Sequence, residues 1–276
     1  MLNDLYHSLD PVAFSAGPIT IYWYGIAYIV GAALTGVVMY RTQKRWGFHI
    51  SMDDLWTVVT CVVFGLLIGA RLFYLVFYGR GLEYYLSNPL EIIAVNHGGM
   101  SFHGGLVGGI AGGAIACRML GLSFWTLADL AVIGAPLALC LGRCANFVNG
   151  ELWGKPTDLP WGVVFETGGD VARHPSQLYE AFLEGIVLFA ILQVLSRRKN
   201  LPPQGFFLGV FVTGYGIVRF LVEFVRVPDA QLGYIWGGVI TMGQILSLPL
   251  IVVGIALLAW SLHARRPQRD YLDAAA

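Results

Sequence analysis

The sequence predicts an all-α protein, a polytopic membrane helix bundle of about seven transmembrane helices. Hydrophobic residues make up 57% of the chain and charged residues only 12%, where ordinary soluble proteins carry about 25% charged residues. Apolar runs of roughly 20 residues recur along the chain, which is the length of helix that spans a bilayer. The 35 glycines and eight tryptophans are typical of membrane helices, in which glycine lies in packing faces and tryptophan at interfaces.

Residues 1–276 are predicted to form a single integral membrane domain. The longest connection, 147–176, is rich in Gly, Pro and Trp and is predicted to form a small cap outside the membrane between the fourth and fifth spans. The shorter stretch 79–98 is predicted to lie along the interface as an arm. The expected spans are roughly 18–40, 55–78, 99–119, 124–146, 177–196, 205–225 and 236–260.

Charge and cysteine usage exclude several protein classes. The formal net charge of zero predicts no nucleic-acid partner, which would require a basic surface. No Lys or Arg precedes Arg41, so the first apolar segment lacks the basic region of a cleavable signal peptide and is expected to remain. All four cysteines lie inside apolar runs, which favours packing roles over disulfides. They are Cys61, Cys117, Cys140 and Cys144.

The distribution of Lys and Arg predicts the orientation. The connections after the odd-numbered spans, with the C-terminal tail, hold ten of these residues, and the opposite side holds four. The positive-inside rule then places the N-terminus outside and the C-terminus in the cytoplasm. The basic residues of the cytoplasmic side are Arg41, Lys44, Arg45, Arg118, Arg197, Arg198, Lys199, Arg265, Arg266 and Arg269.

The third span begins His103-Gly104-Gly105 and repeats glycine every fourth residue in two registers, 104/108/112 and 105/109/113. Such spacing lets a neighbouring helix approach closely over a broad face. Packing explains the glycines, but it does not explain a histidine at the head of the helix.

With this topology the membrane-embedded polar residues gather in the outer half of the bundle. Ionisable groups at this depth are expensive and by default indicate a functional site. Tyr215, Arg219 and Glu223 recur every four residues and form one stripe on the sixth span. The other outer residues are Tyr24, Arg71, His103, Arg143, Asn146, Glu180 and Glu184.

Each of these residues also has a purely structural interpretation. Arg71, Glu180 and Glu184 could pair with one another and hold helices together, and Tyr24 and Tyr215 could be interface aromatics. Arg219 and Glu223 could form a buried ion pair, although such pairs are weak evidence for stability. For Arg143 the functional interpretation is favoured, because it lies close to Asn146, Asn149 and Glu151 beside a glycine-rich turn.

Two arginines and a histidine near the outer leaflet predict a ligand that carries phosphate. A guanidinium forks onto phosphate oxygens and stays charged, and a neutral imidazole can accept a proton near pH 7. A phospholipid headgroup that enters from the outer leaflet fits these requirements. No metal-ligand spacing is present, since the histidines lack helical four-residue spacing and Cys-x-x-Cys does not occur. Cys144 is expected to pack rather than to react.

The segment Gly142-Arg143-x-x-Asn146-Phe147-x-Asn149-x-Glu151-x-x-Gly154 resembles the signature of the bacterial prolipoprotein diacylglyceryl transferases. His103-Gly104-Gly105 is similar to the start of a helix in that family. The blocks at 173–180, Arg-His-Pro-Ser-Gln-Leu-Tyr-Glu, and at 215–224, Tyr-Gly-Ile-Val-Arg-Phe-Leu-Val-Glu-Phe, resemble further family blocks. Ala145 departs from the glycine that many members carry, and a methyl group there is expected to tighten the turn without abolishing the site.

The resemblance implies an enzyme of the bacterial cytoplasmic (inner) membrane whose cap is periplasmic and whose active site faces the outer leaflet. Its substrates would be phosphatidylglycerol and the signal peptide of a prolipoprotein. The diacylglyceryl group would move to the thiol of the lipobox cysteine, which forms a thioether and releases glycerol phosphate. No cofactor is needed. By family match Arg143 and Arg219 would bind and polarise the headgroup, and His103 would be the candidate base. The residues that would shape or support the site are Tyr24, Asn146, Asn149, Glu151, Gly154, Tyr215 and Glu223.

Two other functions remain open from the sequence. A phospholipid headgroup transferase or hydrolase would use the same arginines without a peptide substrate. A transporter for an anionic solute is the second alternative, but transporters commonly contain repeated halves with sites at the membrane midplane. Here no halves repeat, and the polar residues gather on one side.

Overall fold

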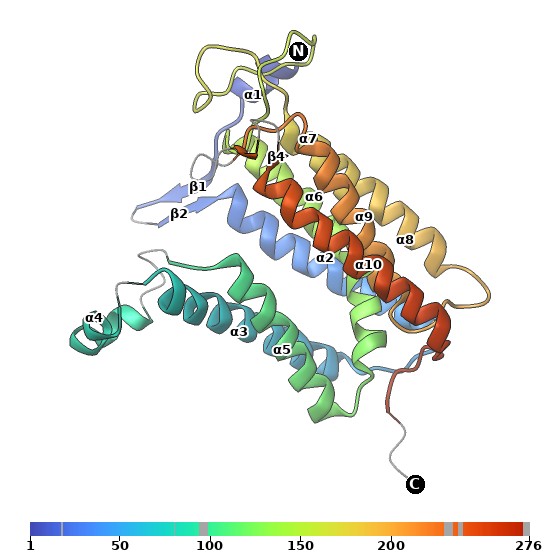
Figure 1. Ribbon diagram of the computed structural model, residues 1–276. Coiled ribbons are helices and arrows are strands. Elements are labelled where there is room, and N and C mark those ends of the chain that lie inside the picture. The colour runs from blue at the N-terminus through green and yellow to red at the C-terminus, as the bar shows by residue number, and fades with distance from the viewer. Residues whose placement is uncertain (18, 80, 94–98, 229–233, 237–239, 273–276) are drawn as a thin grey trace. The chain divides into compact units, whose positions relative to one another are not determined.

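The computed structural model describes residues 1–17, 19–79, 81–93, 99–228, 234–236 and 240–272 (Figure 1). It is mostly helical, which confirms the all-α class. The described residues form two compact units, a first unit of 1–46 and 128–268 and a second unit of 47–127 and 269–276. The helices are α1 (Leu2–His7), α2 (Trp23–Arg45), α3 (Met52–Phe77), α4 (Leu82–Ser87), η1 (Pro89–Ile92), α5 (Phe102–Leu120), α6 (Phe124–Val148), α7 (Ser176–Glu180), η3 (Ala181–Val187), α8 (Leu188–Ser196), α9 (Phe206–Val222) and α10 (Met242–Ala264).

A helix lies at each of the seven predicted spans. Among the described residues, five segments are long and apolar enough to cross a membrane, so the chain has the character of a multi-pass membrane protein. The third and sixth predicted spans correspond to α5 and to the shorter apolar helix α9. The five segments are α2, α3, α6, the run α7–η3–α8 (Ser176–Ser196) and α10.

The first and seventh spans begin later than the sequence predicts, because short hairpins precede their helices. Strand β1 (Val12–Ala16) pairs antiparallel with β2 (Ile19–Tyr22) before α2 begins. Strand β3 (Tyr234–Trp236) likewise pairs with β4 (Ile240–Thr241) before α10. Thr241 and Gln244 form a capping box that fixes the start of α10. Some residues of the predicted elements lie outside the described residues. They are Pro18 and 237–239 of the first and seventh spans, and Arg80 and 94–98 of the interfacial arm.

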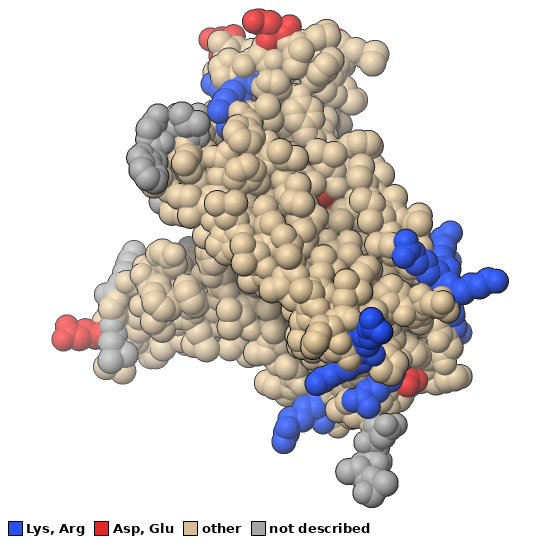
Figure 2. All heavy atoms as spheres, turned by 45° about the vertical axis from the view of Figure 1, so that its right-hand side comes forward, with Lys and Arg blue, Asp and Glu red and all other residues tan. Residues whose placement is uncertain are grey.

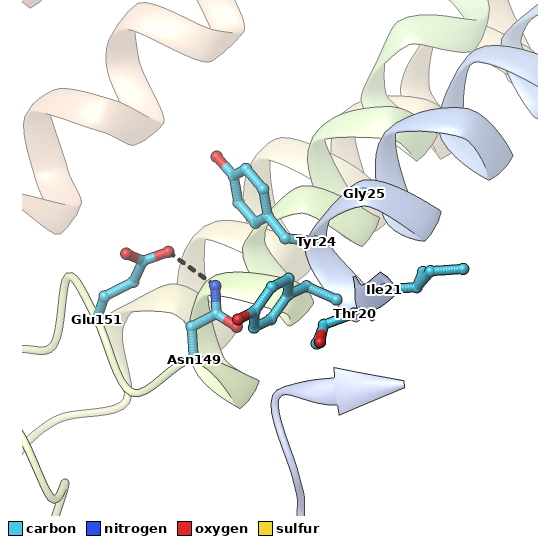
Figure 3. A pocket seen from close by; sticks show the side chains of 7 residues that line it. Thr20, Ile21, Tyr24, Gly25, Asn149 and Glu151 are labelled. Atoms are coloured by element: carbon cyan, nitrogen blue, oxygen red, sulfur yellow. Dashed lines mark hydrogen bonds between the residues drawn. The ribbon is translucent and has the colours of Figure 1, made fainter. Parts of the chain in front are cut away.

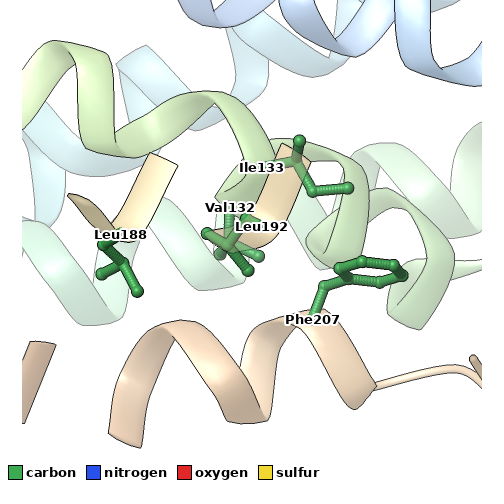
Figure 4. Close-up of a cluster of buried hydrophobic side chains, with 5 residues drawn as sticks. All are labelled: Val132, Ile133, Leu188, Leu192 and Phe207. Carbon is green, nitrogen blue, oxygen red and sulfur yellow. The ribbon is translucent and has the colours of Figure 1, made fainter. Parts of the chain in front are cut away.

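The first unit contains an apolar core between α6, α8 and α9. Val132 and Ile133 of α6 contact Leu188 and Leu192 of α8 and Phe207 of α9 (Figure 4). A Cβ on Gly31 of α2 would lie 2.8 Å from Ala138 of α6, and one on Gly134 would lie 2.9 Å from Thr35. These small residues bring the backbones of α2 and α6 together.

A buried carboxylate fixes the start of α9. Asp129 of α6 is fully buried and accepts hydrogen bonds from the backbone N–H groups of Gly205 and Leu208, each at 2.8 Å. Gln268 Nε2 donates to the same side chain at 2.7 Å. Asp129 therefore satisfies backbone donors that the first turn of α9 leaves without an intrahelical partner. This accounts for a membrane-embedded acid outside the predicted site.

The ends of α2, α8 and α10 meet at one end of the first unit. Trp46 Nε1 donates to the carbonyl oxygen of Ser196 at 3.0 Å, and the Gln204 N–H donates to the carbonyl oxygen of Arg266 at 2.9 Å. Figure 2 shows most of the visible Lys and Arg side chains gathered on one part of the surface. The basic residues at these helix ends are Arg41, Lys44, Arg45, Arg197, Arg198, Lys199, Arg265 and Arg266.

At the other end of the first unit, α1 packs against the connection 147–176. Tyr6 of α1 forms edge contacts with Phe147 and Phe165, whose ring centroids lie 5.5 and 4.9 Å away. Val163 joins this buried cluster. Asn3 Oδ1 accepts a hydrogen bond from the Val164 N–H at 2.8 Å. The connection therefore has its own apolar core, to which the N-terminal helix contributes.

In the second unit, α3 and α5 pack backbone to backbone. A Cβ added to Gly65 or Gly69 of α3 would overlap the carbonyl oxygen of Gly108 or Gly104 of α5, and the converse also holds. The register 104/108/112 is thus the face that α3 contacts most closely. A Cβ on Gly109, in the other register, would lie 3.8 Å from the nearest atom, Val62 Cγ1. The close approach predicted from the glycine spacing is confirmed.

Arg71 of α3 binds backbone carbonyl oxygens. Its guanidinium donates to the carbonyl oxygens of Ile92 at 2.8 Å, of Gly99 at 3.0 Å and of Glu91. Arg71 is only 9% exposed. These contacts tie residues 91–92, which belong to η1, and Gly99 to α3.

Candidate active site

The last turns of α6 and the turn that follows carry the residues of the motif at 142–154. Arg143 and Asn146 lie on the helix, which ends at Val148. Gly150 has a φ of +65°, and a Cβ there would overlap the Tyr6 hydroxyl. Leu152 also has a positive φ, +60°, which is uncommon for a residue other than glycine. The sharp turn sends Glu151 back toward the end of the helix.

Two asparagines bind the Glu151 side chain. Asn146 Nδ2 and Asn149 Nδ2 both donate to Oε1 of Glu151, at 2.7 and 3.3 Å. Gln177 Nε2 of α7 donates to the Glu151 carbonyl oxygen at 2.5 Å. The turn is therefore fixed to the beginning of α7, while the Glu151 side chain stays exposed.

A cavity of about 630 Å³ lies beside this turn, where β2 leads into α2. Figure 3 shows the Asn149 side chain directed at the Glu151 carboxylate, with the Tyr24 ring rising from the start of α2 beside them. The Tyr24 and Tyr28 hydroxyls are 2.9 Å apart. The cavity thus combines a carboxylate, an amide and phenol groups with apolar walls. Its lining residues are Thr20, Ile21, Tyr22, Tyr24, Gly25, Asn149 and Glu151.

Next to Asn146 on α6, Arg143 enters a buried network of charges. Its Nε lies 3.1 Å from Oε2 of Glu180, and its Nη2 lies 3.4 Å from Oε2 of Glu184. Arg219 Nη1 of α9 lies 3.1 Å from Oε1 of the same Glu180 and 2.5 Å from Oε1 of Glu223. Both predicted headgroup arginines therefore contact one carboxylate.

The network extends toward β4. Arg226 Nη1 lies 3.5 Å from Oε1 of Glu180 and 4.0 Å from Oε1 of Glu223. Thr241 Oγ1 donates to Oε2 of Glu223 at 2.6 Å. Together the network contains three arginines and three glutamates and is electrically neutral when all six groups are ionised. Its members are Arg143, Arg219, Arg226, Glu180, Glu184 and Glu223.

The two acids of the fifth span lie at a change of helix type. Glu180 is the last residue of α7, and Glu184 lies in the π-helical segment η3. π-Helical turns inside α-helices frequently occur at functional sites. A Cβ on Gly185 of this segment would lie 2.5 Å from the Cys140 Cβ of α6. The close packing there brings both carboxylates up to Arg143.

Burial differs between the cations and the anions of the network. The Glu180 and Glu184 side chains are fully buried, whereas those of Arg143 and Arg219 are 16% and 15% exposed. Nη1 of Arg143 and the Nε and Nη2 of Arg219 make no hydrogen bond or ion pair with the part of the chain that the structure describes. The buried carboxylates thus contact some of the guanidinium nitrogens and leave N–H donors of the others for a ligand. Such donors suit a phosphate.

Gly154 has a structural role at the base of the cap. Its N–H donates to the His174 carbonyl oxygen at 2.8 Å, and it forms a β-bridge with Arg226. A Cβ would lie 2.6 Å from both the His174 Cβ and the Val225 carbonyl oxygen, so no side chain fits. Burial lowers the pKa of the neighbouring His174 below its ordinary value. Glycine is therefore required where the cap joins the residues after α9.

His103 lies in the second unit, on the first turn of α5, and is exposed. The helix starts at Ser101, whose Oγ accepts a hydrogen bond from the Gly104 N–H at 3.4 Å. The other predicted site residues belong to the first unit. Tyr215 lies on α9, one helical turn before Arg219. No group of three or more His, Cys, Asp and Glu that could hold a metal occurs among the described residues.

Sequence reasoning did not assign site roles to three residues of the network, or to Thr241, which contacts it. Glu180 and Glu184 were expected to be possible structural partners of Arg71, whereas they contact Arg143. Arg226 looked like a loop charge, although its place three residues after Glu223 continues the stripe of Arg219. Thr241 gave no signal, because its contact with Glu223 depends on the β3–β4 hairpin.

Comparison with known proteins identifies the family. The profile of the family described as "Prolipoprotein diacylglyceryl transferase" matches residues 11–260. A protein of Methylococcus capsulatus named phosphatidylglycerol–prolipoprotein diacylglyceryl transferase is 47% identical over 267 residues, 95% of this chain and 98% of its own. Proteins with the same name from Geobacter sulfurreducens and Brucella anthropi are 47% and 44% identical, over 90% of this chain and 94% and 90% of their own. The chain therefore belongs to the prolipoprotein diacylglyceryl transferase family and is a transferase.

Proposed function

We propose that this protein transfers the diacylglyceryl group of phosphatidylglycerol to the thiol of the lipobox cysteine in a prolipoprotein signal peptide. The names of its relatives support both substrates. The observation that carries the proposal is the pair of partly accessible arginines, Arg143 and Arg219, held by buried carboxylates. This pair offers several N–H donors to a phosphodiester in a membrane-embedded setting.

In the reaction, the sulfur of the peptide thiolate attacks the terminal glyceryl carbon that bears the phosphate ester. The C–S bond forms as the C–O bond to phosphate breaks, and glycerol phosphate leaves with the bonding electrons. Negative charge grows on the departing phosphate ester, where fixed cations stabilise it most. Arg143 and Arg219 supply that stabilisation. The thiol is a poor nucleophile, so its proton must pass to a base before or during attack.

His103 is the proposed base. A neutral imidazole suits the task, because its ordinary pKa lies near the working pH. The pH–rate profile of His103→Gln tests this role: loss of the limb assigned to the base supports it, and an unchanged profile shape contradicts it.

The remaining predicted residues are proposed to bind the headgroup or shape its site. Tyr24, Asn149 and Glu151 line the cavity of the first unit, and Asn146 positions Glu151. Tyr215 and Glu223 would support the arginines on α9, and Gly154 would keep the cap closely packed. Residues 147–176 are proposed to be a periplasmic cap on a single integral membrane domain.

The enzyme is proposed to lie in the bacterial inner membrane with its N-terminus outside and its C-terminus in the cytoplasm. The basic residues at the ends of α2, α8 and α10 support this orientation through the positive-inside rule. The arginine network, which lies near the cap at the other end of the first unit, would then face the outer leaflet. There it could meet both a lipid and a translocated peptide.

Incubation of the purified protein with phosphatidylglycerol vesicles and a lipobox peptide tests the proposal. Mass spectrometry is expected to show a gain of one diacylglyceryl unit that disappears when the lipobox cysteine is replaced by serine. Release of glycerol phosphate without modified peptide would instead favour a headgroup hydrolase. Absence of both products, with saturable counterflow of glycerol phosphate in proteoliposomes, would favour a transporter.

A further inference from the structure

Glu180 bridges the two arginines that the reaction needs. One carboxylate oxygen, Oε2, contacts Arg143 Nε at 3.1 Å, and the other, Oε1, contacts Arg219 Nη1 at 3.1 Å. The two arginines lie on different helices, α6 and α9, and Glu180 lies on a third segment, α7. A single rigid carboxylate thus links guanidiniums that no local sequence relation connects.

We propose that Glu180 is a positioning residue that sets the separation and orientation of the Arg143 and Arg219 guanidiniums, so that both reach one phosphate. This inference rests on the proposed function. Glu180 does not touch the substrate in this role. It acts through the arginines. Glu180 and Glu184 hold Arg143 at Nε and Nη2, and Glu180 and Glu223 both hold Arg219 at Nη1, so the position of each guanidinium depends on its contact with Glu180.

The other acids of the network cannot serve the same purpose. Within the described residues, Glu184 forms an ion pair only with Arg143, and Glu223 forms ion pairs only with Arg219 and Arg226. Glu180 alone contacts an arginine of α6 and also the arginines near the end of α9. Removing Glu184 or Glu223 therefore leaves Glu180 in contact with both the Arg143 and the Arg219 guanidinium.

The setting of Glu180 is rigid. Its side chain is fully buried, and it lies where α7 passes into the π-helical segment η3. Ser176 and Gln177 fix the start of α7 to the turn at 151–152 through hydrogen bonds of 2.9 and 2.5 Å to the carbonyl oxygens of Leu152 and Glu151. The carboxylate is therefore positioned by the same elements that position the asparagines of the site.

A purely structural ion-pair role makes a different prediction. Buried ion pairs contribute little net stability, but removing one partner is strongly destabilising because it leaves an unpaired charge. Such a role would change the stability and the amount of folded protein together. A positioning role changes turnover of the folded enzyme, since a displacement of about 1 Å in a catalytic constellation lowers the rate by ~100-fold.

The test compares Glu180→Asp, Glu180→Gln and the matched variant Glu184→Gln in the full-length protein with phosphatidylglycerol vesicles and a lipobox peptide. Aspartate keeps the charge but withdraws the carboxylate by one methylene group. We expect kcat per folded molecule to fall ~100-fold in both Glu180 variants, in line with a misplacement of about 1 Å. KM for phosphatidylglycerol and the thermal midpoint should change much less in Glu180→Asp. Glu184→Gln removes a single contact of Arg143, so its kcat should fall several-fold less than that of the Glu180 variants.

Non-additivity provides the second readout. If Glu180 acts through the arginines, then Glu180→Gln should lower activity less in the Arg143→Lys background than in the wild type, because only its effect through Arg219 remains and residues that act as a unit are not additive. Full kcat in Glu180→Asp, or losses that track only the folded fraction in all Glu180 variants, would overturn the inference. Wild-type protein in the same assay separates the two claims, since its failure to modify the peptide would refute the proposed function instead.

Discussion

The buried charge network of the first unit and the α3–α5 helix pair of the second unit are held together by opposite means. In the network, charged side chains from separate segments meet through ion pairs. In the helix pair, glycines bring backbones into contact with no side chain between them. A substitution in the network removes an interaction, whereas a substitution in the glycine face inserts an obstacle. The first should change chemistry and the second should change folding.

Arg143→Lys should produce the largest effect and act on chemistry alone. Lysine retains the charge but replaces the guanidinium fork with a single ammonium group. We expect activity to fall by ~100- to 1,000-fold, the usual loss when one transition-state donor is removed. The thermal midpoint should stay close to that of the wild type. Peptide modification and thermal unfolding in detergent measure the two quantities, and wild-type turnover in the variant would contradict a bidentate role.

Gly108→Ala should act on folding. The new methyl group would overlap the Gly65 carbonyl oxygen, and overpacking of this kind destabilises by about 1–3 kcal/mol. Gly109→Ala, one residue further along the same helix, is the matched control, because its methyl group would lie 3.8 Å from the nearest atom, at ordinary van der Waals distance. Unfolding of the two variants by heat or denaturant should separate them. Equal stability would mean that α3 and α5 do not approach as closely as described.

Tyr271→Phe should have the smallest effect on stability, because it removes a single polar contact of the second unit. The Tyr271 hydroxyl donates to Asp54 at 2.5 Å, and this hydrogen bond raises the pKa of Tyr271 above its ordinary value. Its loss should destabilise by about 1 kcal/mol near neutral pH. Because the pKa is raised in the folded state, the contribution is complete below the unfolded-state pKa of about 10 and disappears as pH rises through the folded-state value. Unfolding at pH 8 and at pH 11 should show a smaller wild-type advantage at the higher pH.

The sequence predicts the spanning helices well, because length and hydropathy alone determine that signal. Their beginnings are less predictable. Ile19–Tyr22 reads as the start of the first span, since it is as apolar as the helix that follows, but it pairs with β1 instead. The capping box at Thr241 could have located the start of α10, because Thr followed by Gln three residues later is a recognisable N-terminal pattern.

The local parts of the site are also predictable, and the long-range parts are not. The motif around Arg143 and the spacing of Arg219 and Glu223 can be read from neighbouring residues. The contact of Glu180 with Arg219 joins positions 39 residues apart, and no periodicity links them. The sequence left open that Arg71 pairs with Glu180. Only the folded chain shows that Arg71 binds backbone carbonyl oxygens instead.

The π-helical segment Ala181–Val187 gives the fifth span a particular sensitivity to changes in chain length. A π-turn contains one residue more than an α-turn, since its hydrogen bonds run from i to i+5. Deleting a single residue there would let the segment close into a continuous α-helix, with no loss of helical hydrogen bonding. Because the wider π-turn already accommodates the extra residue, the deletion would leave the rotation of Glu180 relative to α8 nearly unchanged. The loss of one residue would thus act locally, by closing the wide turn that carries Glu184 to Arg143, and not by turning the rest of the span.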